Sequence, residues 1–174
     1  SKKQPKKLRM MWNSNGLYAS SGYSNQSAQL VPLIHKEGYD IACVDFYGLE
    51  GGSVRLDGVT HFPKISSPWG DDALVEHGKV FQPDIMFTLQ DIWTMNPQFI
   101  QQMTRFIPII PIDHEPTPPA ILERLKMAYR IVTISKFGHD QLKSEGLHST
   151  YIPHTVDTKI FKKIDGYEAR KQLG

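Results

Sequence analysis

Short apolar segments alternate with longer amphipathic ones along most of the chain, and this alternation constrains the fold more than any other feature. The apolar segments are continuous runs, such as YDIACVDF at 39–46 and IPIIPID at 107–113. Strands that are apolar on both sides belong to parallel sheets with helices on both faces. The pattern therefore predicts an α/β Rossmann-like three-layer sandwich with a mostly parallel sheet of about seven strands.

The boundaries of the expected elements follow from the same pattern and from glycine and proline. Strands are predicted at 8–13, 39–46, 59–63, 84–89, 107–113, 129–135 and 149–153. Helices are predicted between them at 24–37, 69–82, 96–106, 118–128 and 135–146. Gly38 and Gly146 stand where helices commonly end, and Ser135 stands at a helix N-cap position.

Length and composition set limits on the class of protein. The 174 residues suffice for one domain with a core, and 40% hydrophobic with 22% charged residues is typical of soluble globular proteins. The single cysteine, Cys43, cannot form an internal disulfide and is interpreted as a small core residue. No run of about 18 apolar residues and no signal-peptide segment is present, which favours a cytoplasmic location. Residues 1–7 are predicted to be a basic flexible arm that does not bind nucleic acid or lipid.

The loop after the first predicted strand is a candidate anion-binding site. Its sequence SSGYSNQ places hydroxyl groups and Gly22 directly before a helix, where free N–H groups and the helix dipole favour a phosphate. Gly22 would let a ligand approach the backbone. An ordinary N-cap by Ser21 or Ser24 explains the same residues equally well. The loop matches neither the dinucleotide fingerprint nor the P-loop, which argues against both kinds of site.

The segment IPIIPIDHEPTPP at 107–119 ends an apolar strand with Asp113, His114 and Glu115, and prolines follow them. The prolines restrict the backbone and so hold the imidazole in place. A histidine held in this way could bind a substrate hydroxyl or phosphate, or transfer a proton, with a neighbouring carboxylate to orient it. Alternatively, the acidic residues belong to a turn and His114 packs under the next helix.

Other candidate residues lie after the remaining strands. Asp91 and Trp93 in LQDIW offer a carboxylate beside a flat apolar face, which suits a sugar ring, although Trp93 could equally be a core residue. Lys136 could add positive charge at the start of the helix after Ser135, although a solvated helix face explains it equally well. No second histidine or cysteine lies at metal-ligand spacing, so no zinc site is predicted. No serine nucleophile elbow is present.

Three segments resemble a known family. SNGLYASSGYSNQSAQLVPLIHKEGYDI, VTISKFGHDQL and YIPHTVDTKIF are similar to the N-terminal, acceptor-side domain of retaining GT-B glycosyltransferases of the family 4 type. The most specific match is IPHTVDTKIF at 152–161, which fits the family pattern I-P-(H/N)-G-V-D-x-x-x-F except that Thr155 replaces the usual glycine. The resemblance covers nearly the whole chain from about Leu8 onward.

The resemblance implies transfer of a sugar, with retention of configuration, from a nucleotide-sugar donor to a glycan, lipid-linked or protein acceptor. It implies no cofactor, no essential metal and no nucleic-acid partner. In this family the loop glycine approaches the donor diphosphate, which assigns that role to Gly22 with Ser21 beside it. The histidine after the fifth strand lies near the transferred sugar, which makes His114 the catalytic candidate. The remaining residues assigned to the acceptor side or the cleft are Asp91, Trp93, Glu115, Ser135 and Lys136.

The resemblance also implies a division of the chain. Residues 8–154 form the Rossmann-like domain, and 155–174 form a linker and the start of a C-terminal donor-binding domain, whose basic residues and Glu-x7-Glu motif would follow Gly174. This half is therefore expected to be inactive alone. The alternatives are a stand-alone glycan- or anion-binding module, a subunit of a split glycosyltransferase, and an unrelated Rossmann-like nucleotide-binding enzyme such as a reductase. Peripheral membrane association is left open, because many such enzymes act on lipid-linked acceptors.

Overall fold

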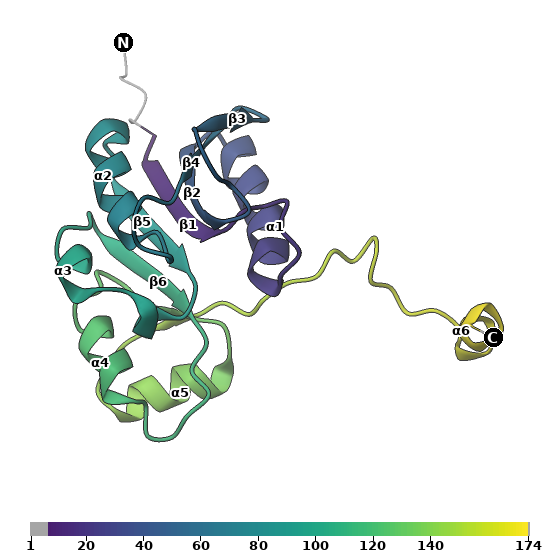
Figure 1. Ribbon diagram of the computed structural model, residues 1–174. Coiled ribbons are helices and arrows are strands. Elements are labelled where there is room, and N and C mark those ends of the chain that lie inside the picture. The colour runs from purple at the N-terminus through teal and green to yellow at the C-terminus, as the bar shows by residue number, and fades with distance from the viewer. Residues whose placement is uncertain (1–6, 174) are drawn as a thin grey trace, which may run out of the picture.

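The computed structural model describes residues 7–173, which form an α/β body and an extension that leaves it (Figure 1). The body is built on a sheet with the strand order β3-β4-β2-β1-β5-β6-β7-β8. All neighbouring strands are parallel except β3 and β4. The strands are β1 (Arg9–Asn15), β2 (Asp40–Tyr47), β3 (Val54–Leu56), β4 (Val59–Pro63), β5 (Ile85–Leu89), β6 (Phe106–Ile110), β7 (Val132–Thr133) and β8 (Thr150–Tyr151).

Helices connect the parallel strands and cover the sheet on both faces (Figure 1). They are α1 (Gly22–Lys36), α2 (Asp71–Phe81), the 3₁₀ turn η1 (Ile92–Thr94), α3 (Pro97–Ile100), α4 (Pro119–Leu125) and α5 (Lys136–Ser144). A further helix, α6 (Gly166–Leu173), follows β8 and lies outside the body (Figure 1). Consecutive residues of β1 belong to different cores: Trp12 packs with Val31 of α1, and Met11 packs with Leu74 of α2. The predicted fold class, a Rossmann-like sandwich with a mostly parallel sheet, is confirmed.

Several elements differ from the sequence-based expectation. The eighth strand, β3, was not predicted because its three residues are exposed and pair with β4 through the backbone. The helix predicted at 96–106 shrinks to the four residues of α3, and the strand predicted at 129–135 shrinks to the two residues of β7. Arg105 has a φ of +40°, which a continuing helix cannot accommodate directly before β6.

The strand order reverses at β1, which has β2 on one side and β5 on the other. In open parallel sheets, the crevice at the carboxyl ends of the strands beside such a reversal is the usual ligand-binding position. Here the loop between β1 and α1 and the turn after β5 border this crevice.

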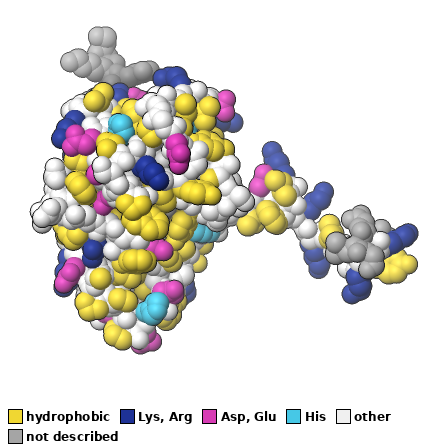
Figure 2. Space-filling model, viewed as in Figure 1, with side chains coloured by type: hydrophobic (Ala, Val, Ile, Leu, Met, Phe, Trp, Pro, Cys, Tyr) yellow, Lys and Arg dark blue, Asp and Glu magenta, His cyan; other side chains and the backbone are white. Residues whose placement is uncertain are grey.

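The body ends in a segment held against α1. Gln26 of α1 donates from Nε2 to the Thr155 carbonyl (2.8 Å) and accepts the Thr155 N–H at Oε1 (3.2 Å). Beyond Thr155 the chain extends away from the body to α6 (Figure 1). This extension carries Lys and Arg side chains beside exposed apolar ones (Figure 2). The basic arm predicted for residues 1–7 lies, apart from Lys7, outside the described residues. Within residues 7–173, no helix has the length and apolar character needed to cross a membrane.

Candidate functional site

A cavity of about 390 Å³ lies at the carboxyl ends of the neighbouring strands β5 and β6. Three segments form its walls: the turn after β5, the segment after β6 and the start of α4. They contribute Asp91, Ile92, Trp93, Pro111, Asp113, His114, Pro118, Ala120 and Ile121. Three of the residues predicted from the sequence, Asp91, Trp93 and His114, therefore line one cavity.

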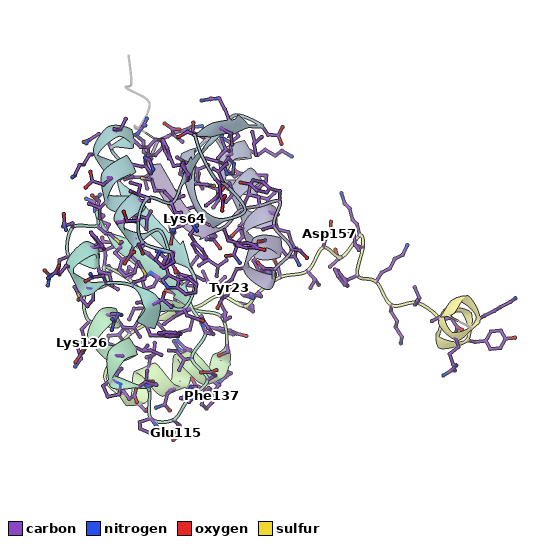
Figure 3. All side chains as sticks on the ribbon, in the orientation of Figure 1. Tyr23, Lys64, Glu115, Lys126, Phe137 and Asp157 are labelled. Carbon is purple, nitrogen blue, oxygen red and sulfur yellow. The ribbon has the colours of Figure 1, made fainter. Side chains whose placement is uncertain are left out.

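His114 is presented to solvent at the edge of this cavity. Its side chain is 67% exposed, so it does not pack under α4. Nδ1 lies 2.5 Å from Oδ1 of Asp113, and this contact orients the ring. If Nδ1 donates to the carboxylate, Nε2 is left as the nitrogen that can accept a proton from a bound ligand. Glu115 follows as an exposed residue on the same segment, at the end of the body near α5 (Figure 3).

Asp91 and Trp93 give the cavity a polar and a flat apolar surface. The side chain of Trp93 is 57% exposed, which excludes the core alternative. Oδ1 of Asp91 accepts a hydrogen bond from the Tyr23 hydroxyl (3.0 Å). Burial, and next the Asp91 charge, raise the pKa of Tyr23 well above its ordinary value, so the hydroxyl remains a donor at neutral pH. Tyr23 thus connects the first turn of α1 to the cavity (Figure 3).

Ser21 and Gly22 lie at the start of α1 and do not line this cavity. Oγ of Ser21 accepts the N–H of Ser24 (3.0 Å) and the amide of Asn15 (2.6 Å), so Ser21 is a helix N-cap. Gly22 is the first residue of α1, and a Cβ added to it would meet no heavy atom within 4 Å. The space beside the Gly22 backbone is therefore open, which is compatible with a bound anion and does not require one.

Ser135 and Lys136 start α5 and also lie outside the cavity lining. Ser135 caps the helix by accepting the N–H of Gly138 (3.0 Å). Lys136 is exposed and pairs with Asp140 (2.6 Å), whose carboxylate raises the pKa of the lysine ammonium. This geometry fits the solvated helix face that the sequence left as an alternative. A role for these two residues in a cleft stays a prediction.

Arg124 shapes the cavity and was not identified from the sequence. Its Nε donates to the carbonyl of Met95 and one terminal nitrogen donates to the carbonyl of Ala120, both at 2.7 Å. The bond to Met95 joins α4 to the turn after β5, which are two walls of the cavity, and the bond to Ala120 lies within α4. No sequence motif distinguishes such an arginine from a surface residue.

A second cluster of polar side chains, which was not predicted from the sequence, lies on β2 and β4, across β1 from the cavity at β5 and β6. Cys43 and Asp45 of β2 and His61 of β4 are all buried, and their candidate ligand atoms lie within 4.8 Å of one another. Burial, and then the Asp45 charge, raise the pKa of the Cys43 thiol. The sequence spacing gave no zinc-site signal because these residues meet across neighbouring strands.

No family model matches the chain, and no curated protein matches it either. Several solved structures match the chain. Sucrose-phosphate synthase from Thermosynechococcus elongatus matches with a TM-score of 0.69 at 12% identity, over 96% of this chain and 52% of that one. An alpha-glucosyltransferase, in complex with UDP and a 13-mer DNA containing an HMU base, matches with a TM-score of 0.55 at 14% identity, over 91% of this chain and 46% of that one.

The chain thus spans about half the length of these two glycosyltransferases. At this level of identity the likeness concerns the fold. It agrees with the topology described above, in which a mostly parallel sheet carries helices on both faces. The chain has the Rossmann-like α/β fold that makes up one part of GT-B glycosyltransferases.

Proposed function

We propose that this chain is the acceptor-side domain of a retaining glycosyltransferase of the family 4 type, which transfers a sugar from a nucleotide-sugar donor. The observation that carries the proposal is the cavity in which Asp91, Trp93 and His114 meet at the carboxyl ends of β5 and β6. The fold shared with two glycosyltransferases supports it, as does the IPHTVDTKIF segment.

The three residues suit a sugar in different ways. The exposed indole of Trp93 offers a flat surface on which the apolar face of a sugar ring can pack. The Asp91 carboxylate can accept hydrogen bonds from hydroxyl groups, and the ring of His114, oriented by Asp113, leaves Nε2 to contact a substrate hydroxyl. Glu115 does not line the cavity but follows His114 in the chain, and we assign it to binding of the acceptor.

We assign the nucleotide-sugar donor to the crevice beside β1, which the loop between β1 and α1 borders. Ser21 and Gly22 stand at the N-terminus of α1, where the helix dipole suits a diphosphate, and Ser135 and Lys136 are assigned to the cleft wall. A second, donor-binding domain completes the cleft, and the reaction needs no essential metal. The acceptor is a glycan, a lipid-linked or a protein substrate and not a nucleic acid. The site of action is the cytoplasm, with membrane contact of a peripheral kind if the acceptor is a lipid.

His114→Ala tests this proposal in the protein that joins this chain to its donor-binding domain. Because the side chain is 67% exposed and bonds only locally to Asp113, the unfolding free energy is expected to change by less than about 0.5 kcal/mol. Sugar transfer is expected to fall by about 100-fold, the low end of what a proton-transferring side chain contributes. Transfer is measured as release of the nucleotide and formation of the glycoside.

The matched control is His148→Ala, because His148 is exposed in the turn before β8 and does not line the cavity. It is expected to leave transfer unchanged. Equal rates for the two variants would remove His114 from the reaction. A loss of activity that only follows a loss of stability would make its role structural.

A further inference from the structure

Cys43, Asp45 and His61 lie together on the α1 side of the sheet, away from the cavity described above. Cys43 and His61 are register partners in the parallel strands β2 and β4, and Asp45 is two residues further along β2. Residues two apart in a strand point to the same face, so all three side chains converge. At most 2% of each is exposed. We propose that these three side chains form a binding site for a divalent zinc-like cation.

The donor set fits such an ion in chemistry and in charge. Thiolate, imidazole and carboxylate are the groups that bind Zn²⁺ in proteins. Sγ of Cys43, a carboxylate oxygen of Asp45 and a ring nitrogen of His61 lie within 4.8 Å of one another. One thiolate and one carboxylate carry two negative charges, which neutralise a divalent cation. A neutral site is what a buried position requires, because uncompensated charge is costly there.

The imidazole of His61 is only partly accounted for by protein contacts. Nδ1 lies 2.7 Å from Oδ2 of Asp45, whereas Nε2 is buried and has no hydrogen-bond partner among residues 7–173. A buried polar atom without a protein partner is uncommon. The ion is assigned to Nδ1, on the side of the ring that faces Asp45, where it replaces the proton shared with that carboxylate. Nε2 then carries the ring proton and is not a ligand.

The neighbouring cavity supplies access to the site. It measures about 230 Å³ and lies between the loop after β1 and the β3–β4 hairpin, with His61 and Tyr18 among its lining residues. The Tyr18 hydroxyl donates to Oδ2 of Asp45 at 3.3 Å. A water molecule from this cavity would occupy the fourth position of a tetrahedral ion. Three protein ligands with one open position form a known arrangement for zinc.

Binding of a zinc ion requires a small movement of the side chains of His61 and Asp45. Zinc bonds to nitrogen and oxygen are about 2.0–2.2 Å long, so two tetrahedral ligand atoms stand roughly 3.3–3.6 Å apart. The 2.7 Å between Nδ1 of His61 and Oδ2 of Asp45 must therefore widen, which a rotation of the carboxylate can provide. Because the thiolate is the binding form, one proton leaves Cys43 for each ion bound.

Cobalt spectroscopy tests the site directly. The purified chain is freed of metal with a chelator and titrated with Co²⁺, which replaces zinc and is coloured. We expect one equivalent to produce intense visible bands of a tetrahedral ion and a near-ultraviolet thiolate-to-cobalt charge-transfer band. Because the sequence contains a single cysteine, that band reports on Cys43 alone. Zn²⁺ is expected to displace the cobalt and abolish both signals.

Two variants complete the test. Cys43→Ala is expected to lose the charge-transfer band and to weaken Zn²⁺ binding by more than about 100-fold, beyond what loss of an outer partner costs. His148→Ala is the matched control and is expected to keep the band. Absence of the band in the folded wild-type chain overturns the proposal, as does undiminished Zn²⁺ affinity in Cys43→Ala. The wild-type spectrum decides even if Cys43→Ala does not fold.

Discussion

Replacement of Gly138 by alanine tests whether close packing of α5 holds the His114 segment in place. Gly138 is the third residue of α5, and a Cβ added there would lie 2.9 Å from Cβ of Ile112 and 3.1 Å from Oγ of Ser135. Neither neighbour can move easily. Ile112 is 4% exposed and directly precedes Asp113, and Ser135 is fixed by capping the helix. The added methyl group must therefore push the backbone that leads to His114.

The expected magnitude combines opposing contributions. Alanine in place of glycine favours a helix by up to about 1 kcal/mol. Overpacking costs about 1–3 kcal/mol, and a weakened N-cap costs about 1 kcal/mol. The net loss of unfolding free energy is about 1–3 kcal/mol, which lowers the melting temperature of a domain of this size by roughly 2–4 °C per kcal/mol.

The assay is urea and thermal unfolding followed by circular dichroism. Gly22→Ala is the matched control, since it also adds a methyl group in the first turn of a helix but meets no heavy atom within 4 Å. It is expected to be neutral or to stabilise the chain by up to about 1 kcal/mol. If Gly138→Ala behaves like Gly22→Ala, the contact between α5 and Ile112 does not constrain the segment, and the reasoning is refuted.

Two more perturbations address the neighbouring features. Burial, and then Asp45, raise the pKa of Tyr18 from 10.0 to about 12, so the neutral phenol stabilises the fold below pH 10 and this contribution is lost as the pH rises toward 12. Tyr18→Phe should therefore flatten the decline of urea-unfolding free energy over this range, and an unchanged slope would contradict the linkage. Arg124→Met keeps the aliphatic stem but leaves the part-buried carbonyl of Met95 without the Arg124 donor, so we expect a loss of about 1–3 kcal/mol. Amide exchange in the turn at 91–95 should become faster, and unchanged exchange would show that Arg124 does not hold that wall.

The sequence predicted the fold where burial determines the pattern. Runs such as the one containing Cys43 and Val44 are apolar because both faces of β2 are covered, and that signal is visible without a structure. The strand β3 has no such signal, because Val54, Arg55 and Leu56 are exposed and only their backbone groups pair. Exposed edge strands are therefore the elements that a periodicity argument misses.

The candidate site residues also fall into those that the sequence could group and those that it could not. Asp91 and His114 could be grouped because each follows a strand of one parallel sheet, and β5 and β6 prove to be neighbours. The meeting of Cys43 with His61 depends on β4 pairing with β2, which the order of the sequence does not reveal. The two interpretations of Ser21 could not be separated in advance, since an N-cap and an anion site use the same helix N–H groups.

The two hydrogen bonds between Gln26 and Thr155 fix the point at which the extension leaves the body. Both polar groups of one side-chain amide are used, and they hold the chain one turn beyond the start of α1. About ten residues then lead to α6, and a fully extended chain of that length reaches no further than about 35 Å. The start of α6 is therefore tethered within that radius of Thr155, where the chain is held against α1. Its encounters with the body are governed by a local concentration set by the linker and not by the concentration of protein in solution.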